Sequence, residues 1–294
     1  MTDLWTPRNH EFLDNGGMPV IYAHQGGIVV APGNAMASFE HAWELGYMYL
    51  ETDGRATKGG ELVAIHDHYL NDGKIENRLV SSLSKADRLA IQRDGHPLVL
   101  IGDIYDAFPD ARISLDIKPD NSVWEFGDNS FNDPGVDMAI KLVKAHQART
   151  CIASFATKNL LELRAALPDA ASAMSFEEMV EVASLIKNPN HVPDIDIGGD
   201  IASVEEVDPI FGRIISSESI AALHGLGKVV HIWTINNRRD MHRLLDMNDP
   251  RLDMDSTAVG TPGNKGIDGF YTDVLGVARD VMIGRGQWRN NRAA

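Results

Sequence analysis

The sequence predicts an α/β fold of the TIM-barrel type, a (β/α)8 barrel forming a single domain over residues 1–294. Short apolar runs alternate with helical runs along most of the chain, which favours parallel strands joined by crossover helices. The chain has 294 residues, 44% of them hydrophobic, which is enough for one large core, and we find no break in composition. An open doubly wound sheet is the alternative. Its dinucleotide-binding version loses support because no Gly-x-Gly-x-x-Gly turn follows the first strand.

The first part of the chain divides into short elements separated by glycine-rich turns. A polar lead-in over 1–18 precedes a strand over 19–23, and Pro32 and Asn34 can begin a helix that Gly46 ends. Strands follow over 49–53 and 62–66. Beyond them we expect an irregular segment over 68–80, helices over 84–92 and 101–108, a strand over 112–118 and a long loop over 119–134.

Strand and helix alternate more regularly in the second part. After a helix over 136–147, we expect strands over 151–155, 171–175, 194–197, 228–235 and 269–272. The helices between and after them are expected over 160–166, 177–185, 217–225, 238–247 and 275–282. A loop over 248–265 and a flexible basic tail over 285–294 complete the chain.

Charge and cysteine content exclude several classes of protein. The formal charge of −15 argues against broad nucleic-acid binding, and an anionic substrate would need local positive charge. The single cysteine, Cys151, excludes an internal disulfide and suits a reducing compartment. No window is apolar and long enough to span a membrane, and residues 1–8 do not resemble a signal peptide. We therefore expect a cytoplasmic protein; its oligomeric state cannot be predicted.

Glu51 and Asp53 are the first candidate functional residues. Side chains on a strand alternate between its faces, so these two carboxylates point the same way. They repel each other, and a divalent cation is the usual remedy, although a solvated pair of strand-end acids is the simpler alternative. In a β/α barrel the carboxyl ends of the strands share one rim. Four further reactive residues are expected at that rim: His24, His66, Asp116 and Lys118.

An ordered set of short motifs covers the chain from about residue 19 to 275. They are Ala23-His24-Gln25-Gly26, Pro32-Gly33-Asn34-Ala35, Glu51-Thr52-Asp53, Thr57-Lys58-Gly59-Gly60, His66-Asp67, Asp116-Ile117-Lys118, Trp233-Thr234-Ile235-Asn236 and Gly269-Phe270-Tyr271-Thr272-Asp273. This set resembles the glycerophosphodiester phosphodiesterase family of the phospholipase-C-like phosphodiesterases. That family carries Ala-His-Arg-Gly, Pro-Glu-Asn-Thr, Glu-Thr-Asp, Thr-Lys-Asp-Gly, His-Asp, Glu-Ile-Lys, Trp-Thr-x-Asn and Gly-x-x-Thr-Asp.

The resemblance implies metal-dependent hydrolysis of a small phosphodiester, in lipid metabolism, to an alcohol and glycerol 3-phosphate. Glu51, Asp53 and Asp116 would hold Mg²⁺ or Ca²⁺ as hard oxygen ligands. His24 and His66 would act as general base and acid at the scissile phosphorus, a role that suits imidazole near neutral pH. In the family, the substrate's neighbouring hydroxyl attacks phosphorus to give a cyclic phosphate that water then opens.

The resemblance also implies substrate contacts, and here the chain departs from the family. Lys118 would contact the phosphoryl oxygens and Trp233 the alcohol portion. Gln25 replaces an arginine that can grip phosphate with a charged fork, so phosphate binding weakens unless Arg55 or Lys118 compensates. Gly33 replaces a glutamate. Asp116 replaces a glutamate with a shorter acid, and Asn71-Asp72-Gly73-Lys74 replaces an Asp-Arg-Thr-Thr segment.

Several functional alternatives remain open. The chain could be an active phosphodiesterase of altered specificity, or a catalytically weak relative that binds a metal and a phosphorylated ligand. A lysophospholipase-D-like or sphingomyelinase-D-like enzyme would need an apolar channel, which Trp124, Phe126 and Phe131 could form. His66-Asp67-His68 could instead belong to an amidohydrolase-like zinc site, although that chemistry needs more histidines at later strand ends. We interpret Asp273 as a turn or capping residue.

Overall fold

The computed structural model describes residues 10–70, 78–119, 133–188, 190–205, 207–208, 213–214, 216–247 and 266–290. Several expectations from the sequence lie outside these residues. They concern Asn71-Asp72-Gly73-Lys74, the channel of Trp124, Phe126 and Phe131, the loop over 248–265 and the outermost parts of the lead-in and tail. Within the described residues, no helix is long and apolar enough to cross a membrane.

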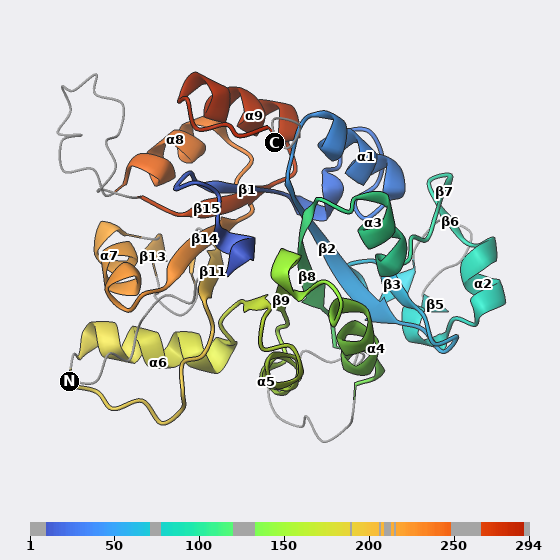
Figure 1. Cartoon of the computed structure of the whole chain (residues 1–294), viewed down its shortest axis with the longest axis horizontal. Helices are drawn as coiled ribbons and strands as arrows, with labels where there is room; N and C mark the ends of the chain where they lie inside the picture. Colours follow the sequence, from blue (N-terminus) through green and yellow to red (C-terminus); the bar gives the residue numbers. More distant parts are fainter. Residues whose placement is uncertain are drawn as a thin grey trace.

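Eight strands of the described chain run parallel and form a nearly closed barrel, which confirms the predicted fold class (Figure 1). A parallel bridge between Ala173 and Ile201 links the two end strands of the sheet. In order around the barrel, the strands are β10 (Ala171–Ser172), β9 (Thr150–Ala153), β8 (Arg112–Ile117), β2 (Tyr49–Ala56), β1 (Val20–Ala23), β15 (Gly269–Thr272), β14 (Val229–Trp233) and β11 (Ile201–Glu205).

Helices cover the outside of the barrel and bury apolar side chains against it (Figure 1). Most of them lie within a few residues of the predicted positions, because their apolar residues recur at helical spacing. They are α1 (Met36–Glu44), α3 (Ile101–Ala107), α4 (Pro134–Val143), α5 (Thr157–Ala166), α6 (Phe176–Lys187), α7 (Ser217–Gly225), α8 (Arg238–Asp246) and α9 (Leu275–Gly284). The described chain also contains short 3₁₀ helices, which are η1 (Glu11–Leu13), η2 (His24–Gly26), η3 (Val80–Ser82) and η4 (Gln147–Arg149).

The prediction that residues 62–66 form a barrel strand is wrong. The observed strand, β3 (Leu62–Ala64), pairs antiparallel with the far end of β2, where Ala64 lies opposite Gly54. A tight turn joins the two strands, with the Thr57 N–H donating to the Glu61 carbonyl at 2.9 Å. Such a short connection permits only antiparallel pairing, since parallel neighbours need a long crossover. The third barrel strand in sequence is therefore β8.

Between β3 and α3, the chain forms a small subregion that has its own apolar cluster. Its elements are β4 (Tyr69–Leu70), β5 (Arg78–Leu79), α2 (Lys85–Ala90), β6 (Gln92–Arg93) and β7 (His96–Pro97). The two strand pairs are antiparallel hairpins that the sequence analysis did not predict. Strands of two residues carry too little alternation to be recognised from sequence.

The predicted strand over 194–197 is also wrong, because the barrel strand begins at Ile201 as β11. Gly198 and Gly199 lie before this strand, and their N–H groups donate to Glu178 Oε1. A short antiparallel hairpin of β12 (Val207–Asp208) and β13 (Arg213–Ile214) follows β11 and was not predicted either.

Aromatic residues fill one end of the barrel interior. The rings of Tyr22 and Tyr271 stack with centroids 4.1 Å apart, and Tyr49 packs edge-on against Tyr22 at 5.4 Å. Phe12 of η1 is fully buried against Tyr22 and Tyr49 and covers this end. Since side chains alternate, residues two positions further along these strands also face the interior, towards the opposite end. This arrangement places the candidate functional residues.

The last described residues pack on the outside of the barrel. Trp288 lies edge-on against Tyr47, with ring centroids 5.0 Å apart, and Arg285 pairs with Asp246. Residues 285–290 thus make specific contacts, and residues 291–294 lie outside the described part of the chain.

Glu178 is a buried acid whose removal should destabilise this fold. It accepts hydrogen bonds from both terminal nitrogens of Arg164, at 2.9 and 3.1 Å, and from the Ser175 N–H at 2.6 Å. We expect Glu178→Gln to lower the free energy of unfolding at pH 7 by about 3 kcal/mol, because it leaves a largely buried guanidinium without its counter-charge. Urea denaturation measures this change.

The same carboxylate makes stability depend on pH. Burial alone would raise the pKa of Glu178, but the hydrogen bonds and charge of Arg164 lower it overall. A carboxyl with a lowered folded-state pKa stabilises above its unfolded pKa and loses this effect as pH falls through the folded value. The difference in the free energy of unfolding between wild type and Glu178→Gln should therefore become smaller as the pH falls below about 4. Glu162→Gln, exposed on α5, is the matched control; equal effects of the two variants would contradict the assignment.

Candidate active site

The predicted site residues converge because they continue the interior-facing positions of neighbouring strands. In β2, Tyr49 faces the interior, and Glu51 and Asp53 follow at two-residue steps. β8 lies beside β2 with Asp116 paired to Asp53. The other strands add further interior-facing positions at the same end: His24 after β1, Lys118 after β8, Trp233 at the end of β14 and Asp273 after β15.

Lys118 links two of the three predicted metal-binding acids. Its Nζ lies 3.0 Å from Asp53 Oδ1 and 2.6 Å from Asp116 Oδ2. All three residues are buried, with no more than 9% of their surface exposed. Burial alone would lower the pKa of Lys118, but the carboxylates of Asp116 and Asp53 outweigh it and raise that pKa. The ammonium group therefore compensates negative charge in this structure, although the sequence predicted that it contacts phosphate.

Glu51 is the third acid and carries the least compensated charge. Its Oε2 accepts the Gln25 N–H at 2.8 Å and lies 3.9 Å from His24 Nε2. Burial, followed by the nearby charge of Asp53, raises the pKa of Glu51 well above its usual value. A carboxylate so placed favours an additional positive charge beside it.

His24 is held in orientation by Asp273, a residue that we did not expect to belong to the site. Its Nδ1 lies 2.7 Å from Asp273 Oδ1, and Asn236 Nδ2 donates to the other carboxylate oxygen at 2.7 Å. Burial alone would lower the pKa of His24, but the carboxylates of Glu51 and Asp273 raise it to about 9. Asp273 caps no helix: α9 begins after Val274, without a side-chain cap. The signal in the sequence was that Asp273 lies two residues after the buried Tyr271, on the same face of the strand.

The chain turns sharply after His24, and glycine permits this turn. Gly26 has a φ of +76°, and a Cβ at this position would lie 2.9 Å from the backbone nitrogen of Phe39. Only glycine adopts this conformation in so little space. The turn brings the Gln25 N–H to Glu51 and directs the His24 ring towards the acids.

Asn34 positions the acids from the loop before α1. Its Nδ2 donates to Asp53 Oδ2 at 2.9 Å, and its Oδ1 accepts from Thr52 Oγ1 at 2.8 Å. Asn34 is buried and has a φ of +66°, a conformation that asparagine tolerates better than most residues. From the sequence we expected only the start of a helix here; the position of Asn34 in the Pro32-Gly33-Asn34-Ala35 motif was the signal.

His66 lies beside these acids but outside the barrel strands. Its Nδ1 lies 2.9 Å from Asp67 Oδ1, its side chain is half exposed, and Arg55 Nε donates to its carbonyl at 2.8 Å. Burial alone would raise the pKa of Asp53, but the charges of Lys118 and His66 lower it. His66 thus lies close enough to influence the charge of Asp53.

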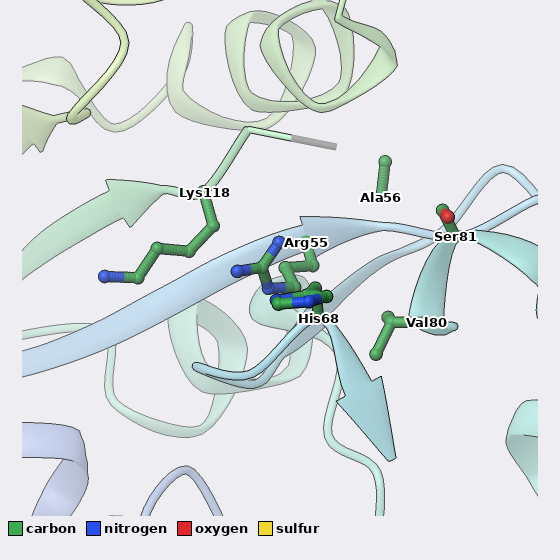
Figure 2. Close-up of a pocket in the computed structure, with 6 residues that line it drawn as sticks. All are labelled: Arg55, Ala56, His68, Val80, Ser81 and Lys118. Atoms are coloured by element: carbon green, nitrogen blue, oxygen red, sulfur yellow. The ribbon is translucent and has the colours of Figure 1, made fainter. Parts of the chain in front are cut away.

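A shallow hollow lies on the outer side of the acid cluster. Figure 2 shows that the Lys118 ammonium group points away from Arg55 and His68 at this hollow, in agreement with its bonds to Asp53 and Asp116. The lining residues are Arg55, Ala56, His68, Val80, Ser81 and Lys118.

Two aromatic rings border the acid cluster on its other side. Lys118 Nζ lies 5.1 Å from the centroid of the Phe155 ring, within the range of a cation–π contact. Phe155 packs edge-on against Trp233 with centroids 6.1 Å apart, although β9 and β14 are not neighbouring strands. Phe155 is 48% exposed and was not predicted as a site residue. Its place two positions after Ala153 of β9 was the signal.

The two substitutions at the first loop are spatial neighbours. The Gln25 side chain lies against Gly33, so closely that a Cβ on Gly33 would overlap Gln25 Oε1. Arg93 Nη1 donates to the Gly33 carbonyl at 3.1 Å. Gln25 thus occupies the space that a side chain at position 33 would need, and the charged pair expected from the family is replaced by an uncharged one.

The acids suit a divalent cation, with one rearrangement. In the described residues, no three acid, histidine or cysteine side chains are grouped to hold a metal as they stand, because Lys118 lies between Asp53 and Asp116. Asp116 Oδ1, however, is buried without a hydrogen-bond partner. This orphaned oxygen, the raised pKa of Glu51 and an all-carboxylate donor set fit a hard cation such as Mg²⁺ or Ca²⁺.

An eight-stranded β/α barrel with acids, histidines and a lysine at one end defines a barrel enzyme site. Residues 24–249 match the model of the glycerophosphoryl diester phosphodiesterase family, and the chain belongs to this family. Its members are phosphoric diester hydrolases, so the predicted enzyme class is confirmed. The family match also decides against an amidohydrolase-like zinc site at His66-Asp67-His68; His68 packs on Tyr69 instead, with ring centroids 4.3 Å apart.

One known protein resembles the chain over nearly its full length, and another resembles about a third of it. A probable glycerophosphodiester phosphodiesterase 2 of Mycobacterium tuberculosis is 29% identical over 282 residues, 95% of this chain and 96% of that protein. Human lysophospholipase D GDPD1 is 30% identical over 115 residues, 34% of this chain and 37% of that protein.

Solved structures share the fold. A putative glycerophosphoryl diester phosphodiesterase of Silicibacter pomeroyi superposes with a TM-score of 0.68 at 20% identity, covering 95% of this chain and 98% of that one. A phosphodiesterase of Oleispira antarctica, in complex with the product sn-glycerol-3-phosphate, gives 0.67 at 15% identity, covering 91% and 98%.

The contact between Asp273 and His24 leads to a prediction. We expect Asp273→Asn to lower kcat for diester hydrolysis by about 10- to 100-fold, with a smaller change in KM, because the amide no longer favours the required orientation and protonation of His24. Steady-state kinetics measure this change, and thermal unfolding verifies the fold.

Asp280→Asn is the matched control, since Asp280 is exposed on α9 and only approaches Arg238 at 3.9 Å. Equal kcat in the Asp273→Asn variant and the wild type would show that the contact has no part in catalysis.

Proposed function

We propose that this chain hydrolyses a glycerophosphodiester, or a related phosphodiester, to an alcohol and glycerol 3-phosphate in a metal-dependent reaction. The observation that carries the proposal is the His24 ring, oriented by Asp273 at 2.7 Å and facing a cluster of three buried carboxylates. A structural histidine has no need of this arrangement. The family membership and the glycerol-3-phosphate complex of the Oleispira antarctica relative support the same substrate class.

Glu51, Asp53 and Asp116 would hold the cation, Mg²⁺ or Ca²⁺. When bound, a divalent ion neutralises charge on phosphoryl oxygens and lowers the pKa of a nearby hydroxyl. In the protein as described, Lys118 supplies the positive charge between Asp53 and Asp116. Once those acids are otherwise compensated, Lys118 can turn to the phosphoryl oxygens, which is the role that the resemblance implies.

His24 and His66 would provide the acid and the base. In the first stage, the base takes the proton of the substrate's neighbouring hydroxyl as its oxygen bonds to phosphorus, and the acid protonates the departing alcohol oxygen. The product of this stage is a cyclic phosphate. In the second stage the two histidines exchange roles: one removes a proton from water, and the other protonates the ring oxygen that leaves phosphorus. Asp273 keeps His24 in position throughout, through its contact with Nδ1.

Trp233, Gln25 and Phe155 would shape the substrate site. Trp233 and Phe155 form an aromatic wall beside Lys118 that suits the alcohol portion. Gln25 offers a neutral amide beside the phosphate position, in place of an arginine fork. This difference favours a diester whose phosphate is held chiefly by Lys118 and the cation.

A second candidate is a catalytically weak relative that binds a metal and a phosphorylated ligand. The observation that favours it is the missing charge at Gln25, together with the pairing of Lys118 to two acids. Such a protein would have no physical need for two acid–base groups, so we rank it second.

Metal dependence is the first test. We expect release of glycerol 3-phosphate from glycerophosphodiesters with Mg²⁺ or Ca²⁺ and its loss with EDTA, because the carboxylates alone would repel the phosphate. His24→Ala and His66→Ala should each reduce kcat by at least about 100-fold, the lower range for an acid–base group.

His41→Ala, on the outer helix α1, is the matched control and should keep full activity. If the protein binds the cation but releases no product from any diester, the second candidate replaces the first.

Restoring the family arginine provides a separate test. We expect Gln25→Arg to lower KM for simple glycerophosphodiesters by about 10-fold, because a charge-assisted contact to phosphate replaces a neutral one. Gln25→Met, of similar length and without polar atoms, is the control. A higher KM for Gln25→Arg would mean that Gln25 is adapted to a different substrate.

A further inference from the structure

Three adjacent aliphatic side chains project from the loop that follows His24. Ile28, Val29 and Val30 are 55%, 69% and 52% exposed. Among the residues that the structure describes, no other run of three consecutive large hydrophobic residues is exposed. Isolated exposed apolar residues are ordinary, but a contiguous group requires an explanation.

The loop is held by several hydrogen bonds, so the exposure of these three side chains is fixed by the structure. The Asn34 N–H donates to the Gln25 carbonyl at 2.7 Å, which closes the base of the loop. Ser38 Oγ donates to the Ala31 and Pro32 carbonyls at 3.1 and 3.0 Å. Ala31 and Asn34 are buried, whereas the three residues before Ala31 are exposed.

The loop is also free of charge. Residues 26–35 contain no acidic, basic or histidine side chain, although 23% of the whole chain is charged. Transfer of this segment out of water therefore removes no ion from its hydration shell. The loop lies at the barrel mouth, since it connects η2, which carries His24, to α1. The half-exposed Phe155 lies at the same mouth beside Lys118.

The size and charge of this surface indicate its partner. A stable protein interface requires about 20–30 residues on each side, and three side chains cannot supply it. Insertion into the boundary between lipid head groups and acyl chains has no such threshold, because it scales with the apolar area that enters the boundary, which these three side chains offer. The net charge of −15 opposes approach to an anionic membrane, so the lipid surface that fits is zwitterionic.

We propose that Ile28, Val29 and Val30 insert into the surface of a zwitterionic lipid bilayer and so present the barrel mouth to phosphodiester head groups carried by its lipids. The part of this inference that concerns substrate rests on the proposed function. It identifies the substrate class as a lipid-borne diester, such as a lysophospholipid, in place of a freely dissolved diester. The relative named lysophospholipase D carries an activity of this class.

Vesicle binding tests the surface directly. The probe is a phosphatidylcholine vesicle containing a minor fraction of lysophosphatidylcholine, and co-sedimentation of the full chain gives the partition coefficient. We expect wild type to bind, Val29→Ser to bind more weakly, and the Ile28→Ser/Val29→Ser/Val30→Ser variant to lose about 10-fold or more in partition. Val29→Trp should increase partition, because tryptophan favours the membrane interface.

Ile283→Ser is the matched control. Ile283 is 47% exposed in the last turn of α9, at the end of the barrel away from the mouth, and its substitution should leave partition unchanged. Failure of the wild type to bind, or equal losses for Ile283→Ser and Val29→Ser, would overturn the proposal. So would a change of molecular mass in solution for the triple variant, which would identify the loop as a contact between copies of the chain.

Hydrolysis separates this inference from the proposed function. With water-soluble glycerophosphocholine, the triple variant should match wild type; with lysophosphatidylcholine in vesicles, its rate should fall in proportion to partition. Equal vesicle rates for the two proteins would overturn the inference even if soluble hydrolysis is intact. Loop-dependent vesicle binding without hydrolysis of any diester would refute the proposed function and leave the membrane contact supported.

Discussion

The structure depends on the burial of three carboxylates at one end of a closed barrel. Glu51, Asp53 and Asp116 would repel one another without compensation, and isolated buried charges are very unfavourable. Lys118 between two of them, the Gln25 N–H on the third and the Asn34 amide provide that compensation from three different segments. The acids therefore hold these three segments together at the barrel mouth.

Strand alternation explains how residues far apart in sequence reach this cluster. The site residues that continue the barrel strands lie two or four positions beyond a side chain at the opposite end of the interior. Tyr22 precedes His24 by two residues, and Tyr271 precedes Asp273 by two. The stacked tyrosines that occupy the interior thus set the register of His24 and Asp273. A change in the packing of this aromatic layer would be transmitted to the mouth.

The substrate side of the mouth differs in character from its acid side. Gln25 and Gly33 replace charged residues by uncharged ones that contact each other, and the adjoining Ile28, Val29 and Val30 are apolar and exposed. Phe155 and Trp233 add an aromatic wall. These features have one property in common, because each presents an uncharged or apolar group at the mouth. A diester carried by a lipid surface is consistent with all of them.

The sequence by itself determined the barrel class, most helices and the family, because these follow from periodicity and from motifs local in the chain. It also proposed His24, Glu51, Asp53, Asp116 and Lys118 as candidates, and the structure brings them together at one end of the barrel. It did not determine that residues 62–64 pair antiparallel with β2, that β11 begins at Ile201, or that Asp273 holds His24. Lys118 was expected to face phosphate, yet it bridges Asp53 and Asp116. Only the tertiary structure decided these points, since each depends on which segments, up to 249 residues apart, come into contact when the barrel closes.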